Sequence, residues 1–369
     1  MKKVFIMIIG AALLCGCSTK DKDMKLNLFA TMPSLEEGFE KGVSACYGAI
    51  YNDTLYVAGG CNFPEKPVTE GGIKRYYKGI LKTASQQVDN TTRWEKVGEM
   101  PATSAYGANI QCDDKWIIAG GMNENGATKK VICINLNDNC SVENLPELPY
   151  AIDNTAGTSV DEKIFVVGGN ADGKSSAMVF VLDLNNLDLG WKELTVMPSR
   201  GRVQPVCAAT KDALYVWGGF SPSDENGDAV AYTDGLKYDF ATNTWELLPD
   251  VMADNEKITF TGGTMTSIDE NTMVAAGGVN RDIFEDAISG RYELVSKADY
   301  MHKAPEWYKF NQYLMIYDVE KKAWKTLDKN KIYARAGALI LSSEKGIFYI
   351  GGELKPGVRT PEIHLLTVD

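Results

Sequence analysis

The stretch ACYGAIYNDTLYVAGG, residues 45–60, contains a weak strand, a polar turn and a second, β-rich strand that ends in two glycines. Five other short apolar runs end in the same doublet. The first glycines of the six doublets are Gly59, Gly120, Gly168, Gly218, Gly277 and Gly351. The sequence therefore predicts one supersecondary unit used six times.

The spacing of the doublets indicates the kind of repeat. Successive doublets are 61, 48, 50, 59 and 74 residues apart, closer to the roughly 50 residues of a kelch blade than to the roughly 40 to 45 of a WD40 blade. Four strands per unit, set radially, make a β-propeller. We therefore expect an all-β fold, a six-bladed kelch-type β-propeller. Its glycine pairs allow close packing near the hub and do not form a phosphate cradle.

The final unit is one strand short. After Ala334 the sequence supplies three strands, near residues 336–341, 347–352 and 362–368, before the chain ends. The segment LNLFATMP, residues 26–33, has the pattern of an outer strand and precedes the first unit. Pairing it with the last blade would cover an open strand edge. We therefore expect an N-terminal strand to close the last blade.

The N-terminus reads as an export signal. Residues 1–17, MKKVFIMIIGAALLCGC, combine a basic start, an apolar stretch too short to span a bilayer, and a small-residue site. The ending resembles a bacterial lipobox, which implies lipidation of Cys17; a plain signal peptide is the alternative. The expected organisation is a lipoprotein-type signal peptide at 1–17, a tether at 18–25 and the propeller at 26–369, in an exported bacterial lipoprotein of the periplasm or outer membrane.

The amino-acid composition limits the classes of partner and cofactor that the protein is expected to bind. The formal net charge of -11 argues against nucleic acid or an anionic membrane surface, since both require a basic footprint. Membrane contact is expected only through the lipid anchor. Cys133 and Cys140 flank a turn and either form a disulfide or remain buried thiols. With two histidines and no metal-ligand spacing, we expect neither a metal nor another cofactor.

Strand parity predicts where a site lies. Residues that precede the innermost strand of a blade and residues that follow its Gly-Gly doublet converge on one face, which we call the mouth. This ring carries planar hydrogen-bonding groups and arginines, which suit a polyhydroxylated ligand with a carboxylate. Its predicted members are Tyr47, Asn62, Tyr106, Asn123, Asn154, Asn170, Arg202, Gln204, Thr261, Asn280, Arg335, Glu353, Lys355 and Arg359.

Three loops stand out at the mouth. In GELKPGVRT, residues 352–360, the Pro356-Gly357 turn folds Glu353 and Arg359 toward each other, and we expect both to project into the axial cavity. An ordinary salt bridge is the alternative interpretation. The insertion at residues 279–313 looks partly helical and suits a lid, and residues 61–80 form a second long loop on the same face.

These motifs, with GGVNRDIF at Gly277 and YARAGALIL at residues 333–341, resemble the kelch-type N-acetylneuraminate epimerases, or sialic acid mutarotases. The resemblance covers nearly the whole mature chain, but the order of the parts indicates a circularly permuted form. It implies interconversion of the α and β anomers of N-acetylneuraminate by acid/base-assisted ring opening and closure. Glu353 matches the proton acceptor and Arg359 its partner arginine; Arg202, Gln204 and Asn280 also have counterparts.

The remaining site assignments are expectations of the same kind. Arg335 sits where the familiar form lacks an arginine, and the sequence does not decide which of Arg202, Arg335 and Arg359 holds the substrate carboxylate. Tyr106 and Lys355 complete the expected substrate-binding set. The alternative function is a non-catalytic kelch lipoprotein that binds sialic acid or another glycan.

Overall fold

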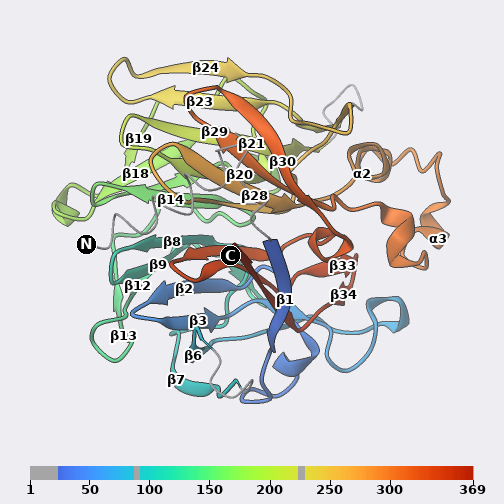
Figure 1. Cartoon of the computed structure of the whole chain (residues 1–369), viewed down its shortest axis with the longest axis horizontal. Coiled ribbons are helices and arrows are strands. Elements are labelled where there is room, and N and C mark those ends of the chain that lie inside the picture. The colour runs from blue at the N-terminus through green and yellow to red at the C-terminus, as the bar shows by residue number, and fades with distance from the viewer. Residues whose placement is uncertain (1–23, 87–91, 223–228, 369) are drawn as a thin grey trace.

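The computed structural model describes residues 24–86, 92–222 and 229–368. Within the described residues, six antiparallel sheets form the blades of a β-propeller, and each blade has four strands side by side from the hub outward (Figure 1). The innermost strands contact one another in order around the ring, and the sixth contacts the first. The predicted six-bladed fold is therefore confirmed.

The strands of the first three blades follow the repeat, from the innermost strand to the outermost. Blade 1 holds β2 (Tyr47–Tyr51), β3 (Thr54–Ala58), β6 (Gly79–Ala84) and β7 (Glu95–Glu99). Blade 2 holds β8 (Ala108–Cys112), β9 (Lys115–Ala119), β12 (Val131–Asn135) and β13 (Ser141–Asn144). Blade 3 holds β14 (Ala156–Val160), β15 (Lys163–Val167), β18 (Val179–Asp183) and β19 (Lys192–Glu193).

The other blades continue the pattern. Blade 4 holds β20 (Val203–Ala209), β21 (Ala213–Ser221), β23 (Gly235–Asp239) and β24 (Thr244–Leu248), with β22 (Val230–Ala231) paired to the end of β21. Blade 5 holds β27 (Gly263–Ser267), β28 (Thr272–Gly277), β29 (Tyr313–Asp318) and β30 (Ala323–Lys329). Blade 6 holds β31 (Leu339–Ser343), β32 (Gly346–Ile350), β35 (Glu362–Val368) and β1 (Met24–Thr31).

Local sequence explains the tight hairpins at the hub. Asn52-Asp53 between β2 and β3, and Asp161-Glu162 between β14 and β15, have positive φ at both residues. This is the backbone of a two-residue type I′ turn, whose twist matches that of the flanking strands, and Asn and Asp tolerate it better than most residues. In blades 1 and 3 the predicted polar turn therefore fixes the register of the two inner strands.

The N-terminal strand closes the ring. β1 pairs antiparallel with β35, from Met24 opposite Val368 to Thr31 opposite Glu362, and Figure 1 shows β1 against the C-terminal strands. Phe29 from β1 packs edge-to-face on Phe348 from β32, with ring centroids 5.0 Å apart. The strand begins two residues before the predicted boundary of the tether, because Met24 and Lys25 continue the pairing with β35. Residues 1–23, including Cys17, lie outside the described residues.

The core is divided between neighbouring blades. Six clusters of buried apolar side chains each join one blade to the next, and the cluster around Phe29 and Leu55 joins blade 6 to blade 1. Burial of this kind provides most of the stabilisation of a repeat fold, because a single blade cannot cover its own apolar faces.

The two candidate disulfide cysteines lie in different clusters. Cys133 belongs to the cluster between blades 2 and 3, and Cys140 to the cluster between blades 1 and 2. They therefore lie on opposite sides of the blade 2 sheet, and both are free, buried thiols.

Short elements decorate the mouth. The hairpins β4 (Cys61–Asn62) with β5 (Arg75–Tyr76), β10 (Met122–Asn123) with β11 (Gly126–Ala127), β16 (Asn170–Ala171) with β17 (Lys174–Ser175), and β33 (Glu353–Lys355) with β34 (Val358–Arg359) follow Gly-Gly doublets. Blade 5 carries helices α2 (Arg281–Ile288) and α3 (Lys297–Tyr300) there instead. A further hairpin, β25 (Met252–Ala253) with β26 (Glu256–Lys257), connects blades 4 and 5, and short 3-10 helices span Phe39–Lys41, Val68–Glu70, Leu187–Leu189, Pro305–Tyr308 and Lys331–Tyr333.

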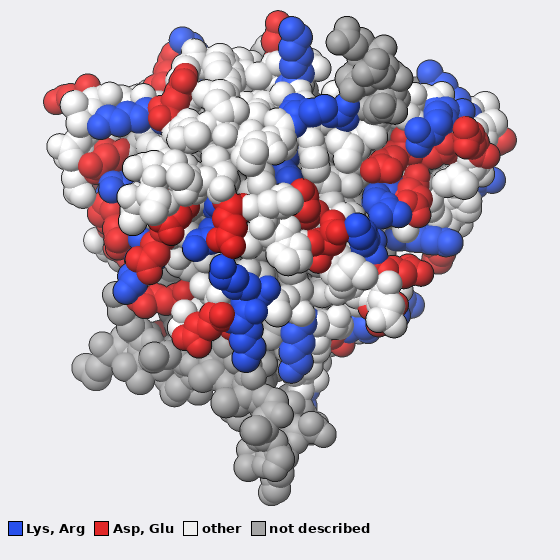
Figure 2. Space-filling model, turned by 90° about the horizontal axis from the view of Figure 1, so that it is seen from above, with Lys and Arg blue, Asp and Glu red and all other residues white. Residues whose placement is uncertain are grey.

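The surface carries charges of both signs. On the face shown in Figure 2, acidic and basic side chains are interspersed and neither sign forms a continuous field. A search of the described helices finds none with the length and apolar character needed to cross a bilayer.

Candidate active site

A ring of six backbone positions surrounds the propeller axis at the mouth. We call it the hub ring: Ala45, Tyr106, Asn154, Gln204, Gly262 and Gly337. Every member has a left-handed φ, between 52° and 67°. Backbone hydrogen bonds link the members from blade to blade, with Ala45 N–H donating to Gly337, Gly337 to Gly262, Gly262 to Gln204, Gln204 to Asn154, and Tyr106 to Ala45. Non-glycine residues seldom adopt this conformation, and such outliers cluster at functional sites.

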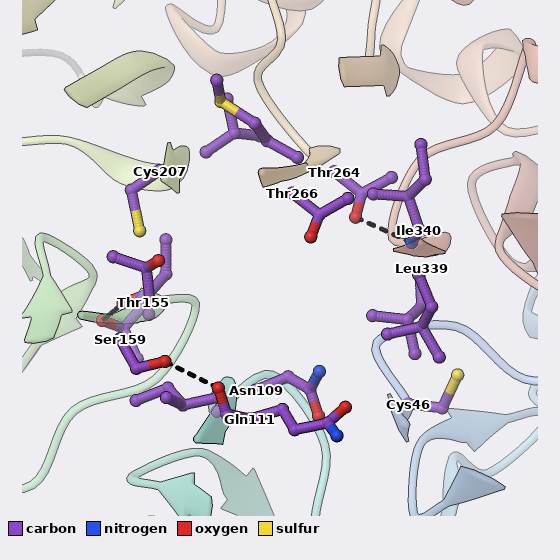
Figure 3. Close-up of a pocket in the computed structure, with 18 of the residues that line it drawn as sticks. Cys46, Asn109, Gln111, Thr155, Ser159, Cys207, Thr264, Thr266, Leu339 and Ile340 are labelled. Carbon is purple, nitrogen blue, oxygen red and sulfur yellow. Dashed lines mark hydrogen bonds between the residues drawn. The ribbon is translucent and has the colours of Figure 1, made fainter. Parts of the chain in front are cut away.

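A cavity of about 900 Å³ runs along the axis from the hub ring. Its walls come from the innermost strands of all six blades (Figure 3). Several polar wall groups are used to link neighbouring blades: Ser159 Oγ donates to the Gln111 carbonyl at 2.6 Å, and Ile340 N–H donates to Thr264 Oγ1 at 3.0 Å. The inner wall is therefore part of the scaffold.

Glu353 and Arg359 face each other across the β33–β34 hairpin. They are opposite partners in its register, and Gly357 at the turn has φ 84°, which glycine adopts without strain. Arg359 Nη2 forms an ion pair with Glu353 Oε1, and the two side chains are 3% and 21% exposed. The predicted turn and pairing are confirmed. Neither residue belongs to the cavity wall, so the prediction that they project into it is wrong.

The Arg359 guanidinium is held from three sides. Its Nε donates to Ser44 Oγ at 3.1 Å, and its Cζ lies 5.0 Å from the centroid of the Phe63 ring. Within the described chain, buried Nη1 has no hydrogen-bond partner. A buried donor left unpaired costs free energy, so this atom is suited to a ligand acceptor such as a carboxylate oxygen.

The pKa of Glu353 is raised above its ordinary value. Burial is the main cause, and Arg359, Lys74 and the Gly357 backbone N–H counteract it. Conversely, Glu353 and Tyr106 raise the pKa of the Arg359 guanidinium against the opposing effect of burial. A carboxylate with a raised pKa is a stronger base than an exposed one, as a group that accepts a proton near neutral pH requires.

Side chains from blades 1 and 2 adjoin the Glu353–Arg359 pair. Lys74, on the loop between β4 and β5, places Nζ 5.2 Å from the Tyr106 ring centroid and 5.9 Å from that of Phe63. The Tyr106 hydroxyl accepts from Cys61 Sγ at 3.3 Å and from Lys74 Nζ at 3.4 Å. We call Phe63, Lys74, Tyr106, Glu353 and Arg359 the mouth pocket.

Lys74 and Phe63 were not predicted individually. The sequence marks residues 61–80 as a long mouth loop, but four cations compete there: Lys66, Lys74, Arg75 and Lys78. The structure pairs Arg75 with Glu65 and Lys78 with Glu99, and it is Lys74 that donates to the Tyr106 hydroxyl. Only the partners in the folded chain distinguish them.

Two predicted carboxylate-binding arginines lie inside blades. Arg202 and Arg335 are both 1% exposed. Arg202 Nη1 donates to the Gly218 carbonyl at 2.9 Å and Nη2 to Asp234 at 2.7 Å. Arg335 makes the corresponding contacts in blade 6, with Nη1 donating to the Gly351 carbonyl at 3.1 Å and Nη2 to Glu362 at 2.8 Å.

Each of these two arginines therefore connects the doublet of its own blade to an acid at the start of the third strand, Asp234 just before β23 and Glu362 as the first residue of β35. This corrects their predicted placement at the mouth. Strand parity predicts where the backbone of each arginine lies. It does not predict that the guanidinium turns toward carbonyls and an acid inside the blade.

Of the other predicted binding residues, Gln204 lies on the hub ring, whereas Asn280 and Lys355 hold parts of the structure together. Gln204 stays on the hub ring, where Nε2 donates to Asn154 Oδ1 at 2.8 Å. Asn280 caps helix α2 by accepting from Ile283 N–H at 3.1 Å. Lys355 Nζ donates to the carbonyls of Met301 at 3.3 Å and Lys303 at 2.6 Å. Lys355 therefore attaches the blade 5 insertion to the hairpin that carries Glu353.

Other members of the predicted mouth set serve internal contacts. Tyr47 shares a hydrogen bond with Ser104 at 2.7 Å, Asn62 donates to the carbonyls of Gly38 and Gly42, and Thr261 donates to that of Gly219. Asn123 and Asn170 lie in mouth hairpins and donate to the Thr103 carbonyl and to Asp153, respectively, in the segments that precede the innermost strands of their blades.

Comparison with known proteins gives one family. Residues 145–369 match the model of the N-acetylneuraminate epimerase family. An N-acetylneuraminate epimerase of Yersinia pestis (strain Pestoides F) is 30% identical over 234 residues, 61% of this chain and 58% of that protein. One of Haemophilus influenzae (strain PittEE) is 28% identical over 249 residues, 64% of each chain. The matched part thus spans less than two thirds of either relative.

Among solved structures, the one described as "Structure of YjhT" superimposes with a TM-score of 0.62 at 16% identity, over 88% of this chain and 97% of that one. At that identity the likeness concerns the fold. The family match, which covers more than half of the residues and includes the whole Glu353–Arg359 hairpin, shows that this chain belongs to the N-acetylneuraminate epimerase family.

Proposed function

We propose that this protein is a mutarotase that interconverts the α and β anomers of N-acetylneuraminate. The observation that carries the proposal is the buried Glu353–Arg359 pair at the mouth, in a chain whose family is named for this sugar acid. The pair offers a base of raised pKa beside a guanidinium with an unused donor.

The residues suit the chemistry of ring opening. Opening a cyclic hemiketal requires removal of the anomeric hydroxyl proton and protonation of the ring oxygen, and closure on the other face reverses both transfers. Glu353 takes the anomeric proton. Arg359 Nη1 binds the substrate carboxylate, and Lys74 adds a second positive charge to the mouth pocket. General acid-base assistance of this kind contributes roughly a hundred- to ten-thousand-fold in rate.

The test is anomer exchange followed by NMR on freshly released N-acetylneuraminate. The wild-type protein should accelerate exchange, and Glu353→Gln, which keeps the shape of the side chain but not its basicity, should abolish the acceleration while the protein stays folded. Saturable sialic acid binding by the wild type without any change in exchange rate would instead identify a glycan-binding protein.

We also propose that the chain is exported and anchored through a lipid on Cys17. The sequence pattern of residues 1–17 supports this. In a bacterial host the full chain should incorporate labelled fatty acid and sediment with membranes, whereas Cys17→Ser should incorporate none. Equal labelling of both chains would refute the assignment.

We propose, finally, that the chain is a circular permutation of the familiar family order. Met24 and Val368 are directly paired between β1 and β35, so a short hairpin loop can join the two ends. A variant with that loop and with new termini between β13 and β14 should retain anomer exchange. Its failure to form a folded propeller would contradict the proposal.

A further inference from the structure

Tyr106 reaches the mouth pocket from a different blade than Glu353. It belongs to the hub ring, with φ 63°, and its backbone N–H donates to the Ala45 carbonyl at 3.3 Å. A left-handed backbone is unusual and unfavourable for an aromatic residue. The fold therefore holds this ring close to Arg359 at a cost, although Tyr106 and the β33–β34 hairpin belong to different blades.

The hydroxyl of Tyr106 receives two hydrogen bonds. Cys61 Sγ donates to it at 3.3 Å and Lys74 Nζ at 3.4 Å. A phenol oxygen accepts at its lone pairs and has one proton of its own. Cys61 Sγ can also accept the phenol proton, but sulfur is a weak acceptor, so a ligand oxygen in the pocket competes well for that proton.

The charges of Glu353 and Arg359 both affect the pKa of Tyr106, so the phenol belongs to the same site as the carboxylate. Burial raises the pKa of Tyr106 well above its ordinary value, Cys61 and Glu353 raise it further, and Arg359 lowers it. The phenol is therefore protonated at neutral pH, while Glu353, paired with Arg359, is the proposed base. Two groups with opposite protonation states in one pocket are the arrangement that acid-base catalysis requires.

We propose that Tyr106 is the proton donor to the ring oxygen, and that it forms the acid half of an acid-base pair whose base is Glu353. This inference rests on the proposed mutarotase function and assigns the second of its two proton transfers. The pair spans two blades, so the catalytic unit exists only in the assembled ring.

The proton balance closes on these two side chains. In ring opening, Glu353 takes the proton of the anomeric hydroxyl, and the bond from the anomeric carbon to the ring oxygen breaks with its electron pair on that oxygen. The oxygen takes the Tyr106 proton. This leaves an open-chain ketone, a neutral Glu353 and a phenolate. After rotation about the bond next to the carbonyl, each proton returns and the ring closes on the other face.

Lys74 is the positioning residue for this donor. Its ammonium touches the Tyr106 oxygen and stabilises the phenolate by charge-assisted hydrogen bonding as it forms. Arg359 lies close enough to influence the same group. While the sugar is in its open-chain form, the Tyr106 phenolate therefore lies near two cations, Lys74 and Arg359, and no further acid is needed.

Two other tyrosines are close enough to compete. Tyr76 feels the charge of Arg359, and Tyr300 that of Glu353. Within the described part of the chain, neither hydroxyl accepts two hydrogen bonds as that of Tyr106 does, and Tyr300 belongs to the blade 5 insertion. Phenylalanine variants at these positions therefore test the choice among the three phenols.

The experiment combines NMR anomer exchange with an independent measurement of N-acetylneuraminate binding. Tyr106→Phe should reduce exchange by about 10² to 10⁴-fold while binding affinity stays within a few-fold of wild type. Tyr238→Phe is the matched control, because its buried hydroxyl donates to Asn243 in blade 4, away from the mouth. Lys74→Arg should retain more exchange than Lys74→Met, and this rescue distinguishes a charge effect from simple packing.

The possible outcomes distinguish a failure of the proton-donor assignment from a failure of the proposed mutarotase function. A wild-type protein without exchange activity would overturn the mutarotase proposal, and the donor assignment with it. An active wild type with an equally active Tyr106→Phe variant would overturn the donor assignment alone. Loss of exchange in Tyr76→Phe or Tyr300→Phe, with Tyr106→Phe active, would transfer the role to that residue.

Discussion

Ala336 and Glu353 form an isolated antiparallel bridge, in which each backbone N–H donates to the carbonyl of the other, at 3.0 and 2.7 Å. Ala336 precedes the innermost strand of blade 6, and Glu353 follows the doublet of the same blade. The bridge ties the backbone of the proposed base to the hub. The base therefore sits on rigid scaffold, as a precisely positioned catalytic group requires.

Anomer exchange should fall on the acid side as Glu353 becomes protonated. Its pKa is raised by burial and held down in part by Arg359, so removing that cation raises it further. In Arg359→Gln the acid limb of the residual exchange should therefore lie at higher pH than in wild type. Rates measured across pH, after subtraction of the spontaneous reaction, check the shift. A limb at unchanged or lower pH would contradict the assignment of Glu353 as base.

Arg335→Met should destabilise the protein and leave the chemistry intact. The guanidinium satisfies the buried carbonyl of Gly351 and that of Glu362, and an unsatisfied buried acceptor costs about 1–3 kcal/mol. We expect a loss of roughly 3 kcal/mol in urea unfolding and normal exchange per folded molecule. Arg75→Met, which removes an exposed ion pair, should change stability by about 0.5 kcal/mol or less. Selective loss of substrate affinity in Arg335→Met would restore its predicted binding role.

Lys355→Ala should loosen the blade 5 insertion. The ammonium joins the carbonyls of Met301 and Lys303 to the β33–β34 hairpin. We expect faster proteolytic cleavage between α2 and α3 and a higher KM, because the insertion packs beside the mouth. Lys345→Ala, in a turn of the same blade, is the control. Identical cleavage patterns in the two variants would show that the lysine does not restrain the insertion.

Deletion of residues 24–33 should abolish cooperative thermal unfolding. β1 supplies the outer strand of blade 6, and Phe29 and Met32 are buried in the cluster between blades 6 and 1. Without β1, the ring is no longer closed by paired strands. Calorimetry of the shortened chain checks this, with a chain that begins at residue 24 as the reference. An unchanged transition would refute the role of the strand in closure.

His364 should make the protein less stable in mild acid. Burial is the main cause, and nearby Arg335 the second, of a pKa lowered to about 4, against which Glu362 acts weakly. The unfolded chain takes up the proton near pH 6.5 and the folded one only near pH 4, so stability is lost as pH falls through this window, by up to about 3 kcal/mol. Denaturant unfolding of His364→Gln should show a smaller loss between pH 7 and pH 5. An equal loss would assign the acid sensitivity to other groups.

The local sequence was enough to predict the repeat, the ring and its closure. Gly-Gly doublets after apolar runs, two-residue polar turns such as Asn52-Asp53 and a final unit lacking one strand are signals carried by neighbouring residues, because backbone conformation and strand pairing depend first on local chemistry. The Glu353–Arg359 pair was predictable for the same reason: a Pro-Gly turn brings its two flanks together within nine residues.

Tertiary structure decided which side chains face the mouth and which satisfy the blade interior. Arg202 and Arg335 occupy mouth positions by parity, yet each turns inward, because buried carbonyls and an acid offer a guanidinium more than solvent does. Lys74 and Tyr106 come from the first two blades and meet the Glu353–Arg359 pair of blade 6 only when the ring has closed. Such contacts depend on long-range geometry and on competition among similar side chains. Local sequence patterns predict neither.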